Sequence, residues 1–397
     1  MRTTRRIFGL TARRQARMRV VLLSALAALL PAAACGSSGS TSGDQPSASS
    51  SAPTSGDAAA IVSELSQPRP AYPVPTTPLG DVAQLRGKVV YFIPITRQAP
   101  QLNVTGKALT EALGSVGIEV QTCDGKANPS DISACVNQAT GARAGAIITD
   151  SIPYALAANS FAAAQAKDIP VLITDQIPDP AHPAGPKLGY LEGSGTKGLL
   201  AIADWIIADS GGKATVVINV ATDTASTQAY VAAAQKEFSA RCPGCKVTLN
   251  RISSANFQLI APSTSSAILS TPGVNYVVSE FEVYLQPTFA GVQQSGRAAA
   301  VKGVSTAAQI NGLQMLAAGT FLHMDVGQAA AYQGWADADA ALRMMLGKEL
   351  PSYDIPIRIF TRDNIKDISV TTAAEASGEW YGPADFPAKF KTLWGLS

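Results

Sequence analysis

The chain carries few residues of the kinds that catalyse reactions. It contains only two histidines, His182 and His323, a small supply for a histidine-based metal site or a Ser-His-Asp triad. No Gly-x-Ser-x-Gly nucleophile motif occurs. Asp223, Glu280 and Glu282 could act as paired carboxylates in acid-base chemistry, but solvated or helix-capping acids are the more ordinary interpretation. These observations disfavour an enzyme, and we expect neither a cofactor nor a metal.

Cys35 lies where a covalent modification is expected. The segment 22–35 reads LLSALAALLPAAAC behind a basic flank, which is typical of a secretory signal rather than a transmembrane span. Its end, Ala32-Ala33-Ala34-Cys35, resembles a bacterial lipobox, with Ala32 replacing the usual leucine. The lipobox cysteine becomes the lipidated first residue of the mature protein. We therefore expect a signal peptide over 1–34 and a lipid-anchored tether with a Pro-rich, extended arm over 35–85.

Other interpretations of this leader stay open. An ordinary signal peptide with a stray cysteine is the alternative to lipidation. Residues 4–8 read TRRIF and resemble a twin-arginine export signal, whereas a start at Met18 would give a compact lipoprotein signal by itself. The export route, Sec or twin-arginine, and the true start, Met1 or Met18, are left undecided.

The other four cysteines are an even number in an oxidising compartment, which favours disulfides. We expect the local pairs Cys123–Cys135 and Cys242–Cys245, with a four-cysteine zinc site as the alternative. Cys242 and Cys245 also form a CxxC motif, but redox motifs of this kind begin a helix after a strand. Here the motif follows an expected helix and precedes an expected strand, so a structural bridge in a turn is favoured.

Gly193–Gly198 reads GSGTKG and fits the outline of the dinucleotide-binding fingerprint. That fingerprint needs an acidic residue at the end of the next strand, and the expected strand instead closes at Asn219–Val220. The exported location also argues against a bound nicotinamide. We therefore expect no dinucleotide site.

The charge balance depends on the leader. The whole chain has 31 Lys and Arg against 29 Asp and Glu, but seven of the arginines and none of the acids lie in residues 1–34. The remainder has 24 basic and 29 acidic residues and a net charge of −5. Because the basic residues form no cluster or stripe, we expect no nucleic-acid partner.

Short apolar, β-branched runs alternate with segments of helical apolar spacing after residue 86. In the first half, the expected strands span 88–95, 118–124, 144–150, 169–175 and 188–192. The expected helices of that half span 103–116, 131–140 (capped by Ser130 or Asp131) and 154–167. In the second half, the expected strands span 214–220, 246–252, 275–281, 298–304 and 321–327, and the expected helices span 197–210, 227–240, 264–269, 287–295, 307–318 and 330–346.

This alternation predicts the fold class α/β, with two doubly wound parallel-sheet lobes joined by hinge segments. The N-lobe is expected over 86–190, completed by about 329–357, and the C-lobe over 191–328, completed by about 358–397. Ligands of open α/β sheets bind at the carboxyl ends of the strands. Asp150 and Asp175, which end two strands, are therefore the first site candidates.

The same arrangement resembles the ribose/galactose-type (type I) periplasmic binding proteins over about residues 86–361. IPITRQAPQL (93–102) resembles the first strand and ligand loop, DIPVLITDQ (168–176) the strand that carries a sugar-binding acid, and ANFQ (255–258) an aromatic loop. The resemblance implies ten ligand-facing residues: Gln101, Leu102, Asp150, Asp175, Gln176, Tyr230, Phe257, Phe281, Ser305 and Gln328.

Several of these positions depart from the family's sugar-binding residues. Two loop aromatics become Gln101 and Leu102, two arginines become Gln176 and Tyr230, an asparagine becomes Phe281 and an aspartate becomes Ser305. Sugar sites use flat aromatic faces and charged groups that bridge hydroxyls, and much of that charge is lost here. The alternative for each residue is a strand-end polar group that caps a helix. The resemblance therefore leaves the identity of the ligand open.

We expect a non-catalytic, extracytoplasmic solute-binding lipoprotein on the cell membrane. It would bind a small polar ligand, sugars among the candidates, and deliver it as a monomer to an ABC permease. The first alternative is a ligand-sensing receptor of a signalling system, and a neighbouring kinase gene rather than a permease gene would favour it. The second is a secreted enzyme, which turnover on a substrate panel would reveal.

Overall fold

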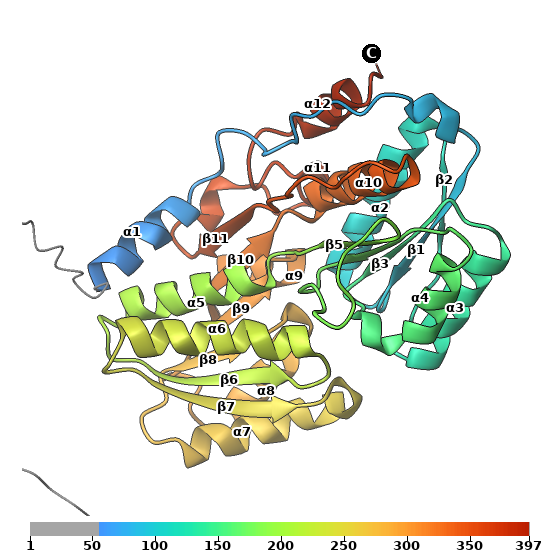
Figure 1. Cartoon of the computed structure of the whole chain (residues 1–397). Helices are drawn as coiled ribbons and strands as arrows, with labels where there is room; N and C mark the ends of the chain where they lie inside the picture. Colours follow the sequence, from blue (N-terminus) through green and yellow to red (C-terminus); the bar gives the residue numbers. More distant parts are fainter. Residues whose placement is uncertain (1–54, 397) are drawn as a thin grey trace, which may run out of the picture. The chain divides into compact units, whose positions relative to one another are not determined.

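The computed structural model describes residues 55–396 (Figure 1). The expected signal peptide and its export signal, both candidate starts and Cys35 lie outside the described residues. Within 55–396, no helix is long and apolar enough to cross a bilayer.

The N-lobe is built on a five-stranded parallel sheet in the order β2-β1-β3-β4-β5. Its strands are β1 (Val89–Pro94), β2 (Glu119–Thr122), β3 (Ala146–Asp150), β4 (Val171–Thr174) and β5 (Leu188–Leu191). One face packs against α2 (Pro100–Val116) and α10 (Ala330–Met345), and the other against α3 (Pro129–Gly141), the short helix η2 (Tyr154–Leu156) and α4 (Ala158–Gln165). Strands β3 and β4 are buried along their whole length, as their apolar sequences predict.

The C-lobe sheet has six strands in the order β11-β10-β9-β8-β6-β7. They are β6 (Thr215–Ala221), β7 (Lys246–Ile252), β8 (Tyr276–Ser279), β9 (Lys302–Ala307), β10 (Leu322–Gln328) and β11 (Ile357–Thr361). Its helices are α5 (Gly195–Asp209), α6 (Ala225–Arg241), η3 (Ser254–Leu259), α7 (Ile260–Ser270), η4 (Glu282–Tyr284), α8 (Leu285–Gln294) and α9 (Ile310–Ala317). The expected doubly wound α/β lobes are confirmed, with β11 as an antiparallel edge strand that we did not expect.

Between β1 and β11 the chain crosses from one lobe to the other after β5, after β10 and after α10. These hinge segments bond to one another. The Oε1 atom of Gln328 accepts the Ser194 N–H at 2.6 Å, and the Ala329 N–H donates to the Pro356 carbonyl at 3.0 Å. Side chains that follow β4, β5 and β10 are therefore brought together at the hinge.

The segment expected as tether and extended arm contains packed structure in its described part. Helix α1 (Ser55–Leu65) lies on α5 and contributes Ala58, Val62 and Leu65 to the C-lobe core. That spacing of three apolar residues is a helical stripe, which we overlooked in a composition rich in small residues. After it, Tyr72 stacks on Tyr332, and η1 (Val82–Leu85) is anchored by buried apolar residues.

The C-terminal segment also differs from expectation, because it does not complete only the C-lobe. Strand β11 joins the C-lobe sheet, and η5 (Ile365–Asp367) and α11 (Thr372–Ser377) follow it. Helix α12 (Phe386–Leu393), however, packs on α10 of the N-lobe. Trp394 stacks on Trp335 with ring centroids 5.6 Å apart, so aromatic packing decides the destination of this arm.

Two local predictions need correction. The helix expected over 154–167 is divided into η2 and the shorter α4. The cap of α3 is Asn128, whose Oδ1 accepts the N–H groups of Ser130 and Asp131, rather than Ser130 or Asp131 itself. Pro129 occupies the first helical position, so the helix begins two residues before the expected start at 131.

The four described cysteines form two pairs on different lobes, Cys123–Cys135 and Cys242–Cys245, with Cα atoms 5.7 and 5.3 Å apart. They are therefore not assembled into a single four-cysteine zinc site. The Cys242–Cys245 pair follows α6 and precedes β7, as predicted. Its sulfurs do not lie at a helix N-terminus, where a dipole would activate a thiolate.

Candidate ligand-binding site

Two candidate acids lie side by side at the carboxyl edge of the N-lobe sheet. Asp150 ends β3, Asp175 follows β4, and Asp150 pairs in register with Thr174. Asp150 is completely buried. Its Oδ1 accepts the Ser151 hydroxyl at 3.1 Å, and its carboxyl group is within hydrogen-bonding reach of Asp175. Both strands turn sharply here, because Ser151 and Asp175 have φ of 62° and 54°, in the left-handed region.

Asp175 is held by the hinge. The Nε2 of Gln328 donates to its Oδ1 at 3.1 Å, and Gln328 also contacts the Oε1 of Gln333. A Cβ on Gly193 would lie 1.5 Å from the Asp175 Oδ1, so only glycine permits this approach. The Gly193–Gly198 motif therefore serves close packing at the hinge, and β6, the strand after α5, ends at Ala221 rather than at an acid.

A third acid, Asp337 on α10, completes this cluster. Burial raises its pKa well above the usual value, and the charge of Asp175 adds to that shift. Burial likewise raises the pKa of Asp150, followed by the charges of Asp175 and Asp337. Burial also raises the pKa of Asp175, but hydrogen bonds from Asp150, Gln328 and Gln333 oppose that rise. Burial therefore favours the neutral forms of Asp150 and Asp337, while the hydrogen bonds to Asp175 favour its ionised form.

Tyr230 and Gln176 connect this cluster to the C-lobe. The Tyr230 hydroxyl, on α6, donates to the Asp175 carbonyl at 3.3 Å. A Cβ on Gly195 would lie 2.4 Å from the Tyr230 ring, so this glycine too is required by a close approach. Burial raises the pKa of Tyr230, and the charges of Asp175, Glu192 and Glu280 raise it further. Gln176 is buried, and its Oε1 has no partner among the described residues.

The carboxyl edge of the C-lobe sheet carries an acid and three aromatic rings. Glu280 follows β8, and its Oε2 accepts the Ala221 N–H at 2.6 Å, while burial raises its pKa to about 8. Phe281 and Phe257 each meet Tyr284 edge to face, with centroids 6.2 and 6.0 Å away. Phe257 is 41% exposed, so its ring faces solvent.

The remaining sequence candidates stand apart from these two groups. Gln101 is half-buried and Leu102 buried in the first turn of α2. Ser305 is buried inside β9, where its hydroxyl is 3.4 Å from the Thr306 carbonyl. No hydrogen bond or ring contact within residues 55–396 links these three to the Asp175 cluster. The structure thus brings together Asp150, Asp175, Gln176, Tyr230 and Gln328 in one group, and Phe257 and Phe281 in another.

Sequence reasoning missed several members of the site. Asp337 and Gln333 lie on a helix that is buried on all sides, and polar residues on such a helix were a usable signal. Glu280 was considered only as half of a catalytic pair. Glu282, by contrast, caps α9 through the N–H groups of Gln309 and Gly312, which is the ordinary helix-capping role.

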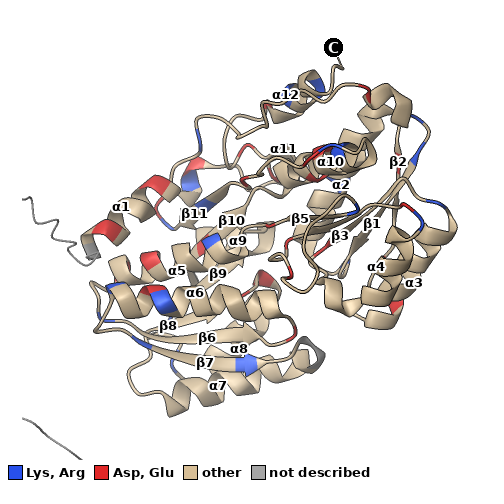
Figure 2. Ribbon diagram, viewed as in Figure 1, with Lys and Arg blue, Asp and Glu red and all other residues tan. Residues whose placement is uncertain are grey.

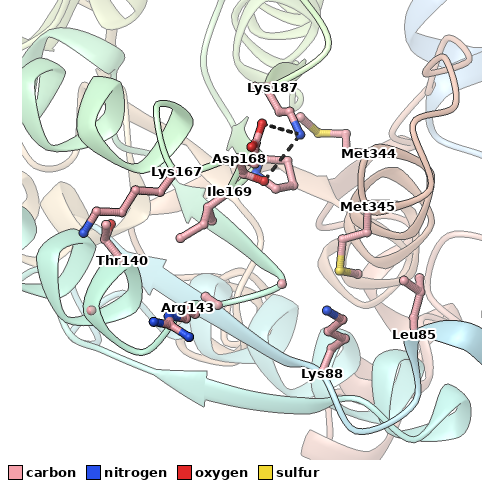
Figure 3. Close-up of a pocket in the computed structure, with 14 residues that line it drawn as sticks. Leu85, Lys88, Thr140, Arg143, Lys167, Asp168, Ile169, Lys187, Met344 and Met345 are labelled. Atoms are coloured by element: carbon pink, nitrogen blue, oxygen red, sulfur yellow. Dashed lines mark hydrogen bonds and ion pairs between the residues drawn. The ribbon is translucent and has the colours of Figure 1, made fainter.

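A hollow of about 580 Å³ lies at the opposite, amino edge of the N-lobe sheet (Figure 3). Four basic residues, Lys88, Arg143, Lys167 and Lys187, surround it, and Lys187 pairs with Asp168 at 3.4 Å. None of the ten candidates lines it. Helices α3, α4 and α10 end at this edge, so basic residues there complement the negative ends of the helix dipoles.

Comparisons with known proteins agree with the fold. Residues 90–349 match the family described as a periplasmic binding protein domain. Similar solved structures include a 5-methylthioribose transporter solute-binding protein from Thermotoga lettingae in complex with 5-methylthioribose. The two share 16% identity, with a TM-score of 0.65 over 80% of this chain and 99% of that one.

Two further solved structures are ABC transporter solute-binding proteins. The protein from Agrobacterium vitis, bound with α-D-tagatopyranose, is 17% identical, with a TM-score of 0.64 over 71% of this chain and 97% of that one. The protein from Bacillus halodurans, with bound myo-inositol, is 15% identical, with a TM-score of 0.62 over the same shares. No protein with a curated description matches the sequence.

Proposed function

Because the chain belongs to the periplasmic binding protein domain family, we propose that it is an extracytoplasmic receptor that delivers a small polar solute to an ABC importer. It is a binding protein and not an enzyme, as its family indicates. The observation that carries the proposal is the hinge cluster. Asp175 of the N-lobe, Ser194 of the first crossover and Gln328 of the second are hydrogen-bonded in one chain of contacts.

This geometry supports a binding cycle in which the two lobes open and close about the hinge segments. The carboxyl edges of both sheets carry the candidate residues, as expected for an open α/β fold. In the structure, the 175–177 segment touches α6 directly, since the Ile177 N–H donates to the Ser226 hydroxyl at 3.2 Å. Ligand entry therefore requires these contacts to separate, and the closed form is what a permease would recognise.

We assign the ligand contacts to the ten candidates, with the Asp175 cluster at the centre. Tyr230 and Gln328 lie beside Asp175, and Phe257 and Phe281 offer rings to the apolar face of a ligand. Gln101, Leu102 and Ser305 are peripheral contacts that depend on lobe movement. The similar solved proteins carry 5-methylthioribose, tagatopyranose and myo-inositol, which supports a hydroxylated ligand of that size.

A thermal-shift screen of the purified exported domain tests this function. The panel should contain sugars, polyols, nucleosides and small amides, and a true ligand should raise Tm because it binds only the folded state. Hits would then be measured by calorimetry. A panel of this breadth without a single binder, on protein that is folded by circular dichroism, would contradict the solute-receptor function.

The membrane anchor and the oxidised cysteines are separate parts of the proposal. Cys35 is the proposed lipidation site, and Cys35→Ser should release the protein from membranes; retention after a high-salt wash would place the anchor elsewhere. Cys123–Cys135 and Cys242–Cys245 should be oxidised in the exported protein, and non-reducing peptide mapping that finds free thiols would contradict this. A monomer in solution is also expected, by light scattering.

A further inference from the structure

The buried acids away from the proposed site have cationic partners. Asp204 pairs with Arg241 at 2.5 Å, and Asp339 pairs with Arg343 at 2.7 Å. All four side chains are buried. An unpaired charge in the interior is costly, and a neighbouring guanidinium offsets that cost. The fold thus supplies an arginine where a buried carboxylate is structural.

A second set of buried acids is compensated by the backbone. Asp325 accepts the Ala308 N–H at 3.1 Å, and Glu282 accepts the N–H groups of Gln309 and Gly312. These donors lie at the start of α9, whose N-terminal dipole favours negative charge. Backbone donors thus compensate both acids, although the Asp325 Oδ2 is also without a donor among the described residues.

The acids at the proposed site have no cationic partner among the described residues, and their donors are few: Glu280 accepts the Ala221 N–H and Asp175 accepts the Gln328 amide. Within residues 55–396, no lysine or arginine pairs with Asp150, Asp175, Asp337 or Glu280. The basic residues at the carboxyl edges of the two sheets, Arg97, Lys126 and Arg251, are exposed. Asp175 of the N-lobe and Glu280 of the C-lobe both raise the pKa of Tyr230 by their charge. The lack of a nearby cation therefore applies to both lobes.

The site also has spare hydrogen-bond acceptors. Among the described residues, no donor reaches the Oε1 of Gln176 or the Oε1 of Glu280, both in buried residues. Both carboxyl oxygens of Asp337 are also without a donor. Buried polar atoms are normally satisfied, so a group of unmatched acceptors calls for a ligand rich in donors.

The aromatic rings of the C-lobe edge suit the same ligand. Phe281 and Phe257 pack edge to face around Tyr284, and the exposed Phe257 ring is available to a ligand. An aromatic face attracts a cation through its quadrupole. A carboxylate together with a free ring therefore favours a positively charged group.

We propose that the ligand of this site carries a protonated amino group on a small hydroxylated framework, as an amino sugar does. An ammonium group donates three hydrogen bonds and accepts none, which matches a site with excess acceptors and no cation. A neutral sugar would bring hydroxyls that are acceptors as well as donors. This inference rests on the proposed solute-receptor function and names its ligand class.

Calorimetry on matched series tests the inference. Each series compares a neutral sugar, its amino analogue and the N-acetylated form, for example glucose, glucosamine and N-acetylglucosamine, with equivalent sets for galactose and myo-inositol. In at least one series the amine should bind about tenfold or more tightly than its neutral partners, as charge-assisted hydrogen bonds are stronger than neutral ones. If neutral members bind as well as the amines in every series, the inference is overturned while the receptor function stands. If nothing in the series or the wider panel binds, both fail.

Charge-neutralising variants separate recognition from structure. Glu280→Gln and Asp175→Asn keep the side-chain shape and should each weaken amine binding about tenfold, with the neutral analogue changed by less than about twofold. Glu111→Gln, at an exposed position on α2, is the matched control and should change neither. A purely structural role for Glu280 or Asp175 would weaken amine and neutral analogue equally, and that result would also overturn the inference.

Discussion

The two ends of the N-lobe sheet carry opposite charges in opposite environments. At the carboxyl edge, Asp150 and Asp175 lie against the hinge, and Asp150 is fully buried. At the amino edge, Lys88, Arg143 and Lys167 are exposed around an open hollow. Figure 2 shows acidic and basic residues interspersed over the rest of the chain's ribbon. Neither volume nor charge alone identifies the ligand site, because the hollow at the amino edge is lined by solvated charges.

This difference indicates that, in this fold, buried acidic groups without a cationic partner identify the ligand site. An exposed lysine next to a helix C-terminus loses little hydration and gains from the dipole. A buried carboxyl group without a cation loses hydration and gains no ion pair that offsets this cost. Such a group is therefore expected mainly where it has a function, such as binding a ligand. Four predictions test this distinction, in order of expected effect.

The largest effect should come from removing a cation from a structural buried acid. Arg343→Met leaves Asp339 buried without its arginine, although Tyr353 and Trp394 still donate to it. We expect a loss of about 3–5 kcal/mol in the free energy of unfolding, measured by urea denaturation. Asp337→Asn, two residues away on the same helix, should change it by less than about 1 kcal/mol, because no cation pairs with Asp337 and burial already favours its neutral form. Equal losses in both variants would erase the distinction between paired and unpaired acids.

A smaller but still large effect is expected from displacing Asp175 without changing its chemistry. Gly193→Ala places a methyl group where the Asp175 carboxylate lies, so that carboxylate must move. Ligand affinity should fall by roughly 2–4 kcal/mol in calorimetry, as if the acid itself were lost. Gly141→Ala, on the amino-edge side with nothing within 4 Å of the new Cβ, is the control and should leave affinity unchanged. Wild-type affinity in Gly193→Ala would show that the position of Asp175 is unimportant.

Unpaired acids should also give the ligand-free protein an unusual pH dependence. Burial raises the pKa of Glu280 to about 8 and that of Glu282 to about 7, and raises those of Asp150, Asp337 and Asp325. Between pH 8 and 6.5 the folded state therefore binds more protons than the unfolded chain, whose carboxyl groups titrate near pH 4. Stability should rise as pH falls through this window, by up to about 1.4 kcal/mol per pH unit for each proton taken up.

Below about pH 6.5, His323 changes the pH dependence of stability in the direction opposite to that of the buried acids. Burial lowers its pKa, so the unfolded chain takes up a proton there that the folded state does not. Glu280→Gln should reduce the slope between pH 8 and 6.5, measured by thermal unfolding at several pH values. A stability that is flat or rises with pH in the wild-type protein would mean that these acids are ionised in the folded state.

The site residues that were predictable from sequence are those that follow from a local sequence pattern. Asp150 and Asp175 end short apolar β-branched runs, and parallel strands place such ends at one edge, so both candidates could be named without a structure. Gln328 and Tyr230 were reached only through a family resemblance. The pairing of those residues with Asp175 involves positions more than fifty apart in sequence.

The parts that were not predictable depend on which elements dock where. Asp337 is buried because α2, α12, Tyr72 and η1 all cover α10, and no local pattern specifies that docking. The helical stripe of α1 was hidden in a segment of small residues, and α12 reached the N-lobe through tryptophan packing rather than chain proximity. Glu280 was visible as an acid, but its lack of a cation became apparent only from the contacts around it.

Calorimetry on Asp175→Ala tests the central claim most directly, once a ligand has been identified by screening. Truncation of a carboxylate that closure buries against the ligand should cost roughly 2–4 kcal/mol of affinity. Arg143→Ala should leave the affinity unchanged, because the Arg143 side chain is exposed and lines the hollow at the amino edge of the sheet. A dissociation constant of folded Asp175→Ala within about threefold of wild type would contradict the account and remove Asp175 from the ligand site.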